Sequence, residues 1–164
     1  MLYLWLVFLH VLSGFVYFFS HGASAFILLK LSQERNVDRI HALLDLRAYA
    51  APAMNWSGGL LFLSGIVAGF IGHWWRSGWI WVSLGLLVLV SILMTVFGRT
   101  YFERVRKAIG LEFTLKGSKP SPPEKPVDEK ELAAVIASGK PVLLASSGLV
   151  ALALIVWLMM FKPF

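Results

Sequence analysis

Residues 2–29 read LYLWLVFLHVLSGFVYFFSHGASAFILL, and this stretch decides the fold class. It is almost entirely apolar, interrupted mainly by three serines and two histidines, His10 and His21. A helix needs about 20 apolar residues to cross the ~30 Å hydrocarbon core of a bilayer. A secretory signal peptide would begin with basic residues and have a shorter apolar run. We therefore predict that residues 2–29 form a membrane-spanning helix.

Three further apolar stretches, at about 50–75, 79–98 and 142–161, are each long enough to cross a membrane. Hydrophobic residues make up 58% of the 164-residue chain and charged residues 15%, and the mean hydropathy is +0.74. A soluble domain is closer to half apolar and a quarter charged, so this composition excludes a water-soluble enzyme. We predict an all-α fold in which four transmembrane helices form one integral membrane domain over residues 1–164.

Lysine and arginine are distributed very unevenly along the chain. Thirteen of the fifteen lie in residues 30–48 and 99–140, and the other two are Arg76 and Lys162. Cytoplasmic connections are enriched in Lys and Arg, so we expect both segments to face the cytoplasm and both termini to lie outside. Tryptophan favours the headgroup level, and four tryptophans flank the outer turn: Trp74, Trp75, Trp79 and Trp81. The net charge of +6 then reflects topology and anionic lipid, and we expect no nucleic-acid partner.

The cytoplasmic segment 99–140 is predicted to be a linker with a short interfacial helix. Its first part, residues 99–109, should continue the third span as a helix. Glu103 and Lys107 are four residues apart and are expected to pair on the helix surface. Gly110 is expected to end the helix, because glycine is the commonest residue just beyond a helix C-terminus.

The rest of the cytoplasmic part also has recognisable signals. Residues 117–126, rich in proline, serine and lysine, are typical of an extended linker. Asp128 followed by Glu131 predicts a capping box, which would open a short helix through Ser138 on the membrane surface. Residues 37–46 are expected to form an amphipathic turn in the first cytoplasmic connection.

Polar side chains recur at spacings of three and four residues in the first span: His10, Ser13, Tyr17, His21 and Ser24. This spacing places them on one face of a helix. The two imidazoles should be ~16 Å apart along the axis, because each residue rises 1.5 Å. A polar side chain inside a span indicates a functional site, and an ionisable one does so most strongly.

We predict that His10 binds the iron of a b-type haem, or holds another tetrapyrrole, within the helix bundle. A neutral imidazole buried among Phe, Leu and Trp is a common axial ligand. Tyr17 and His21 belong to the same stripe and are included in the candidate cofactor-binding set. The alternative is that each histidine hydrogen-bonds a neighbouring helix, since polar side chains also hold spans together.

Other groups that would hold the haem are spread over several spans. His73, at the outer end of the second span, is one candidate for the second axial ligand. A five-coordinate iron, a methionine ligand (Met54 or Met94) and a ligand from another subunit are the alternatives. Arg47 and Arg99, at the inner membrane edge, would hold a propionate or a lipid phosphate, or would simply anchor the helices.

Four glycines share one face of the second span: Gly58, Gly65, Gly69 and Gly72. Gly65 and Gly69 are four residues apart, the spacing that is common where two membrane helices approach closely. We predict that this face packs against another helix, either within the bundle or across a dimer.

The first two spans resemble those of a known group. Residues 5–14 (WLVFLHVLSG) and 47–56 (RAYAAPAMNW) are similar to the first helix and the start of the second helix of bacterial CopD/HemJ-like four-helix integral membrane proteins. The ending 162–164 (KPF) is similar as well. Residues 79–84 (WIWVSL) lack the histidine and lysine that HemJ-type enzymes carry there, so the chain is most similar to the uncharacterised relatives. The resemblance implies the bacterial inner membrane, and the termini that the charge distribution places outside would then be periplasmic.

Three classes of function follow from these features. The first is a haem-binding protein with a redox or electron-transfer role. The second is a non-catalytic accessory or assembly subunit, as a homodimer or in a larger membrane complex. The third and most distant is CopD-like copper transport, which is disfavoured because ion pathways usually need charged groups inside the spans, whereas Lys30 and Arg99 lie at the cytoplasmic edge. Whether the chain is an enzyme is left open.

Overall fold

The computed structural model describes residues 1–115 and 119–164. These residues are 80% helical and form no strand. The elements in chain order are α1 (Leu2–Leu31), α2 (Val37–Ile71), η1 (Trp74–Arg76), α3 (Gly78–Leu93), η2 (Met94–Arg99), α4 (Thr100–Ala108), α5 (Glu129–Ala137) and α6 (Pro141–Phe161). Four helical stretches are long and apolar enough to cross a membrane. The predicted all-α bundle of four spanning helices is therefore confirmed, and the chain is a multi-pass membrane protein.

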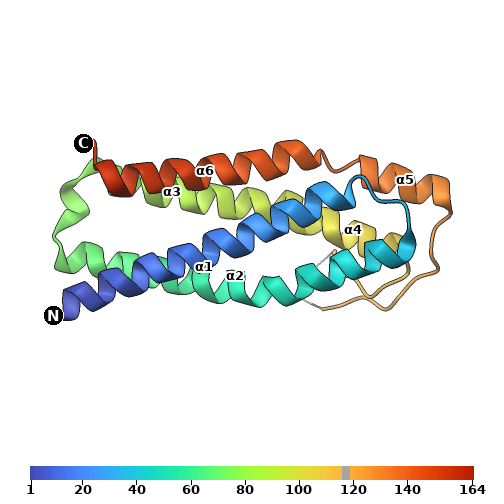
Figure 1. Cartoon of the computed structure of the whole chain (residues 1–164), viewed down its shortest axis with the longest axis horizontal. Helices are drawn as coiled ribbons and strands as arrows, with labels where there is room; N and C mark the ends of the chain where they lie inside the picture. Colours follow the sequence, from blue (N-terminus) through green and yellow to red (C-terminus); the bar gives the residue numbers. More distant parts are fainter. Residues whose placement is uncertain (116–118) are drawn as a thin grey trace.

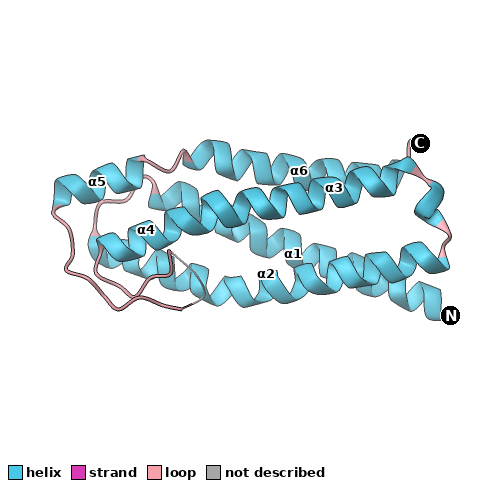
Figure 2. Ribbon diagram, turned by 180° about the vertical axis from the view of Figure 1, so that it is seen from behind, coloured by secondary structure: helices cyan, strands magenta, loops and turns pink. Residues whose placement is uncertain are grey.

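The four long helices lie side by side, and both chain termini are at the same end of the bundle as η1 (Figure 1). We call this the terminal end. At the opposite end, the connection end, lie α5 and the loops around α4 (Figure 2). Tryptophans gather at the terminal end, where ring centroids are 5.6 Å apart for Trp74 and Trp79 and 5.4 Å apart for Trp75 and Trp81. Which side of the membrane each end faces stays a prediction.

The second helix is longer on its N-terminal side than its apolar stretch predicts. It runs from Val37 to Ile71, so the predicted amphipathic turn at 37–46 and the second span form one continuous helix. The Asn36 side chain accepts a hydrogen bond from the Arg39 N–H at 3.1 Å, and this cap explains why the helix begins there. Pro52 lies inside the helix without ending it, as is tolerated in membrane helices.

The third helix continues beyond its apolar part, as predicted. α3, η2 and α4 form one helical stretch, Gly78–Ala108, and Gly110 follows it with φ 79°. The η2 segment is π-helical. The predicted Glu103–Lys107 pair is wrong: Lys107 pairs with Glu124 at 3.1 Å, and Glu103 accepts from the Thr114 N–H at 2.7 Å. The chain after α4 folds back over this helix and supplies both partners.

The short helix α5 begins where the sequence predicts it. The Asp128 carboxylate accepts from the Glu131 N–H at 2.7 Å. Leu132 and Ile136 are buried, and the Tyr101 hydroxyl donates to the Ile136 carbonyl at 3.0 Å. The apolar side of α5 is thus covered by protein. Of the predicted linker, residues 119–126 are not helical, and residues 117 and 118 lie outside the described residues.

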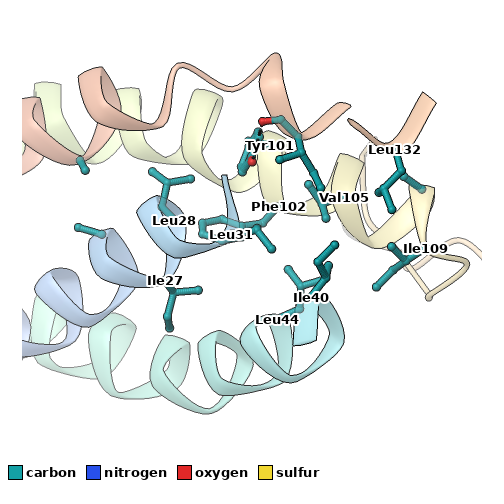
Figure 3. Close-up of a cluster of buried hydrophobic side chains, with 14 residues drawn as sticks. Ile27, Leu28, Leu31, Ile40, Leu44, Tyr101, Phe102, Val105, Ile109 and Leu132 are labelled. Carbon is teal, nitrogen blue, oxygen red and sulfur yellow. Dashed lines mark hydrogen bonds between the residues drawn. The ribbon is translucent and has the colours of Figure 1, made fainter. Parts of the chain in front are cut away.

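The largest hydrophobic core lies at the connection end, where α1, α2, α4 and α5 meet (Figure 3). Leu31, Ile40, Val105 and Ile136 are fully buried there. Elsewhere most apolar side chains of the long helices face outward, as expected for surfaces in contact with lipid. A smaller cluster of Trp79, Ile80 and Leu158 lies at the terminal end. The helices are therefore joined most firmly near one end.

The long helices associate in two pairs, α1 with α2 and α3 with α6. α1 also packs against α6 and so connects the pairs. In the described residues no extensive contact joins α2 to α3, and this side of the bundle is more open.

Candidate functional site

His10 is held against α2 by two hydrogen-bonding contacts of one ring nitrogen. Nδ1 lies 3.0 Å from the carbonyl oxygen of Leu61 and 3.1 Å from Oγ of Ser64. A carbonyl oxygen only accepts, so Nδ1 carries the proton and donates. The Ser64 hydroxyl donates in turn to the Leu60 carbonyl at 2.6 Å. Nδ1 is therefore the protonated nitrogen of the ring, and when the imidazole is neutral its Nε2 is the basic nitrogen.

A glycine makes room for this imidazole. A Cβ atom at Gly65 would lie 2.9 Å from Cε1 of His10. The same relation recurs one layer nearer the connection end, where a Cβ at Gly58 would lie 3.0 Å from Cε2 of Tyr17. Both glycines thus seat large side chains of α1 on α2. The hydrogen bond from His10 to a neighbouring helix, the alternative role in the sequence-based prediction, is present.

The two histidines of the stripe meet different helices. His21 is buried, with 7% of its surface exposed, and its Nε2 lies against Gly148 of α6. The Met94 methyl group is 3.2 Å from the position that a Cβ at Gly148 would occupy. The Tyr17 and His21 rings are stacked, with centroids 6.2 Å apart and planes 20° from parallel. Because α1 lies between α2 and α6, its inward-facing side chains contact both neighbours: His10 and Tyr17 contact α2, and His21 contacts α6.

The remaining predicted site residues lie apart from these. His73 follows the end of α2, eight residues beyond Gly65 and so ~12 Å farther along the helix direction. Arg99 is exposed at the end of η2, near the connection end. The structure thus brings Tyr17 and His21 together, places His10 in the next layer, and leaves His73 and Arg99 toward opposite ends.

The described residues supply one candidate haem ligand at His10. Its Nε2 takes part in none of the hydrogen bonds found, which suits a ligand whose other nitrogen donates to a carbonyl. Neither His73 nor Met94, two of the candidates for the second axial position, lies beside it, since Met94 approaches His21 instead. No group of three His, Cys, Asp or Glu side chains suited to a metal ion occurs in the described residues.

A groove between α2 and α3 was not predicted. Two adjoining cavities of about 250 and 480 Å³ share Phe62, Val88 and Ile92 as walls. Tyr17 and Gly58 line the smaller cavity, while Trp81 lines the larger one toward the terminal end. We call these cavities together the α2–α3 groove. Its lining is mainly apolar.

The glycine face of α2 packs within the chain. Gly58 and Gly65 face α1, and a Cβ at Gly69 would lie 3.2 Å from both Ile80 and Trp75. Gly65 and Gly69 therefore serve different neighbours, and the predicted packing face is confirmed as one inside the bundle. Gly148 on α6 has the same role and was not predicted from the sequence.

No protein-family model, curated protein or solved structure matches this chain. The resemblance to the CopD/HemJ group thus depends on the quoted residues and stays a prediction.

Substituting glycines on α2 tests the seating of α1. Gly65→Ala should lower the free energy of unfolding in detergent by about 1–3 kcal/mol, because the added methyl group overlaps His10. Gly59→Ala is the matched control, because nothing lies within 4 Å of a Cβ there. It should leave stability unchanged or raise it by up to ~1 kcal/mol through helix propensity. Equal thermal unfolding of both variants would contradict this packing.

Proposed function

We propose that this chain is a non-catalytic subunit of a larger membrane complex, and that a transmembrane helix of another subunit docks on the outer face of α1. The observation that supports it is a row of residues on α1 spaced alternately by three and four. We call this row the α1 aromatic stripe: Trp5, Phe8, Leu12, Phe15, Phe19, Gly22 and Phe26.

The α1 aromatic stripe is on the side of α1 opposite the inward-facing His10, Tyr17 and His21. Phe15 and Phe19 are exposed by 71% and 78%. A repeat averaging 3.5 residues keeps one face of a helix turned toward a supercoiled partner. Most membrane helices pair with this left-handed geometry. Contact with lipid alone requires only apolar residues, with no such register.

The contacts that the inward-facing polar groups make with neighbouring helices also favour a subunit over an enzyme. The His10 imidazole is hydrogen-bonded to α2, and His21 lies against a glycine of α6. These are the contacts by which polar and small residues join membrane helices. These contacts of His10 and His21 support a structural role for the inward-facing polar residues.

We further propose that the chain lies in a bacterial inner membrane with both termini on the periplasmic side. The charge distribution supports this orientation, because thirteen of the fifteen lysines and arginines lie in residues 30–48 and 99–140 of the sequence. The resemblance to the CopD/HemJ group supports the bacterial membrane.

Reporter fusions test the orientation. Alkaline phosphatase fused after Phe164 should be active, because that enzyme folds outside the cytoplasm. The same enzyme fused after Ser138, at the connection end, should be inactive. The reverse pattern would overturn the orientation.

The absence of cysteine allows a site-specific test of the docking face. Benzophenone attached to Cys in Phe19→Cys should, on illumination of native membranes, give a discrete heavier band on a denaturing gel. Phe70→Cys on α2 is the matched control, because Phe70 is also an exposed phenylalanine, at 64%. It should give no protein adduct.

The mass of the crosslinked product identifies the neighbour. A band at twice 18.3 kDa would assign the docked helix to a second copy, and any other mass to a different subunit. Labelling of lipid alone from position 19 would contradict the proposed face.

A second candidate is a b-type haem bound through His10 in an electron-transfer role. The favouring observation is the Nδ1–H donated to the Leu61 carbonyl, which orients the ring and leaves Nε2 basic. A haem held there would exchange single electrons. His10 of this chain would supply one ligand to the iron. The remaining coordination position would be filled by a ligand from a partner helix or would stay open.

Visible spectroscopy separates the two candidates. If haem is bound, the purified protein should show a Soret band and an α band that sharpens on reduction with dithionite. His10→Ala should abolish both bands, while His41→Ala, on the exposed start of α2, should keep them. A colourless protein after expression with added haem precursor would eliminate this candidate and leave the subunit proposal standing.

A further inference from the structure

Cationic side chains converge where α2 meets the third helix near the connection end. The Arg47 guanidinium of α2 lies 4.0 Å from the centroid of the Phe102 ring on α4. Arg99, Glu103 and Arg106 are spaced by four and three residues, which places them on the face of this helix that also carries Phe102. We call Arg47, Arg99 and Arg106 the arginine corner. Three guanidinium groups face one carboxylate, so the corner has a surplus of positive charge.

The one carboxylate in this corner also has a second partner. Glu103 accepts a hydrogen bond from the Thr114 N–H at 2.7 Å. Arg106 donates to the Glu112 carbonyl at 2.7 Å, which holds it in place without neutralising it. Arg47 is half-buried, whereas Arg99 is exposed. A guanidinium removed from water in this way is stabilised by a bound anion.

The α2–α3 groove lies on the terminal-end side of the arginine corner, and its nearest wall residue on the third helix, Ile92, precedes Arg99 by seven residues or ~10 Å. Gly58 follows Arg47 by eleven residues on α2, and Val88 precedes Arg99 by eleven on the third helix. Both separations correspond to ~16 Å along a helix. One leaflet of a bilayer has a hydrocarbon thickness of about 15 Å, half of the ~30 Å core. An acyl chain whose phosphate lies at the corner would therefore reach the near part of the groove, between Ile92 and Val88, with its terminal half.

We propose that one anionic phospholipid binds here, with its phosphate at Arg47 and Arg99 and an acyl chain in the α2–α3 groove along Val88 and Ile92. Charge complementarity selects an anionic headgroup, and the apolar groove selects a lipid over free phosphate. The site is separate from the α1 aromatic stripe, which lies on the opposite side of α1 from the groove-lining Tyr17.

The test is a titration of the purified full chain with lipid in a neutral detergent, followed by native mass spectrometry. Phosphatidylglycerol should bind one to one and at least about tenfold more tightly than phosphatidylcholine, since each arginine near a membrane surface contributes roughly fivefold. Inorganic phosphate at the same concentrations should not compete. Equal affinity for the two lipids, or full competition by inorganic phosphate, would overturn the proposal.

Two variants locate the site. Arg99→Gln should weaken phosphatidylglycerol binding about fivefold and leave phosphatidylcholine binding unchanged. Arg104→Gln is the matched control, because Arg104 is an exposed arginine of the same helix outside the corner. It should have no effect. An equal loss in both variants would show general attraction to cationic surface and contradict a specific site.

Val88→Trp tests the groove without touching the charges. The indole fills the cavity, so this variant should weaken the binding of both lipids while keeping the preference for phosphatidylglycerol. Unchanged binding would overturn the placement of the acyl chain. No partner subunit is present in these titrations, so their failure would not bear on the subunit proposal.

Discussion

Side chains in hydrocarbon gain little by moving from lipid into a protein interior, and this constraint shapes the whole bundle. Two other kinds of contact hold it together. One is the core at the connection end, where Leu31, Ile40, Val105 and Ile136 are fully buried. The other is the close seating of large α1 side chains on glycines along the spans. The helices are therefore held together mainly by buried apolar side chains at the connection end, and mainly by shape complementarity along the spans.

The central helix of this arrangement is α1. Its inward face carries His10, Tyr17 and His21, and each meets a glycine on a neighbouring helix. Its outward face carries the exposed phenylalanines. One helix thus joins the two pairs of the bundle and also carries the face on which we propose that a partner helix docks. The groove between α2 and α3 exists because no comparable set of contacts closes that side.

Hydropathy predicted the four spans well, because the cost of placing charged groups in lipid leaves few alternatives. It did not predict that α2 starts at Val37, since residues 37–46 are amphipathic and their helix depends on a cap at Asn36. The Glu103–Lys107 pair failed because Glu124 and Thr114, distant in sequence, compete for those charges. For the site, spacing predicted that His10 and His21 share one face of α1. The register between helices, which brings Leu61 and Gly148 to them, is set by packing and has no local signature.

The π-helical segment η2 has a consequence for how the third helix is built. A π turn contains one more residue in each hydrogen-bonded loop than an α turn. Residues beyond it are consequently rotated by roughly 100° relative to an uninterrupted helix, the angle that corresponds to one residue. The side chains of α3 and of α4 therefore do not follow one common rotation about the helix axis. Each of the two helices can present the face that its own surroundings require. Deleting one residue within Met94–Arg99 would restore the regular α-helical rotation between them.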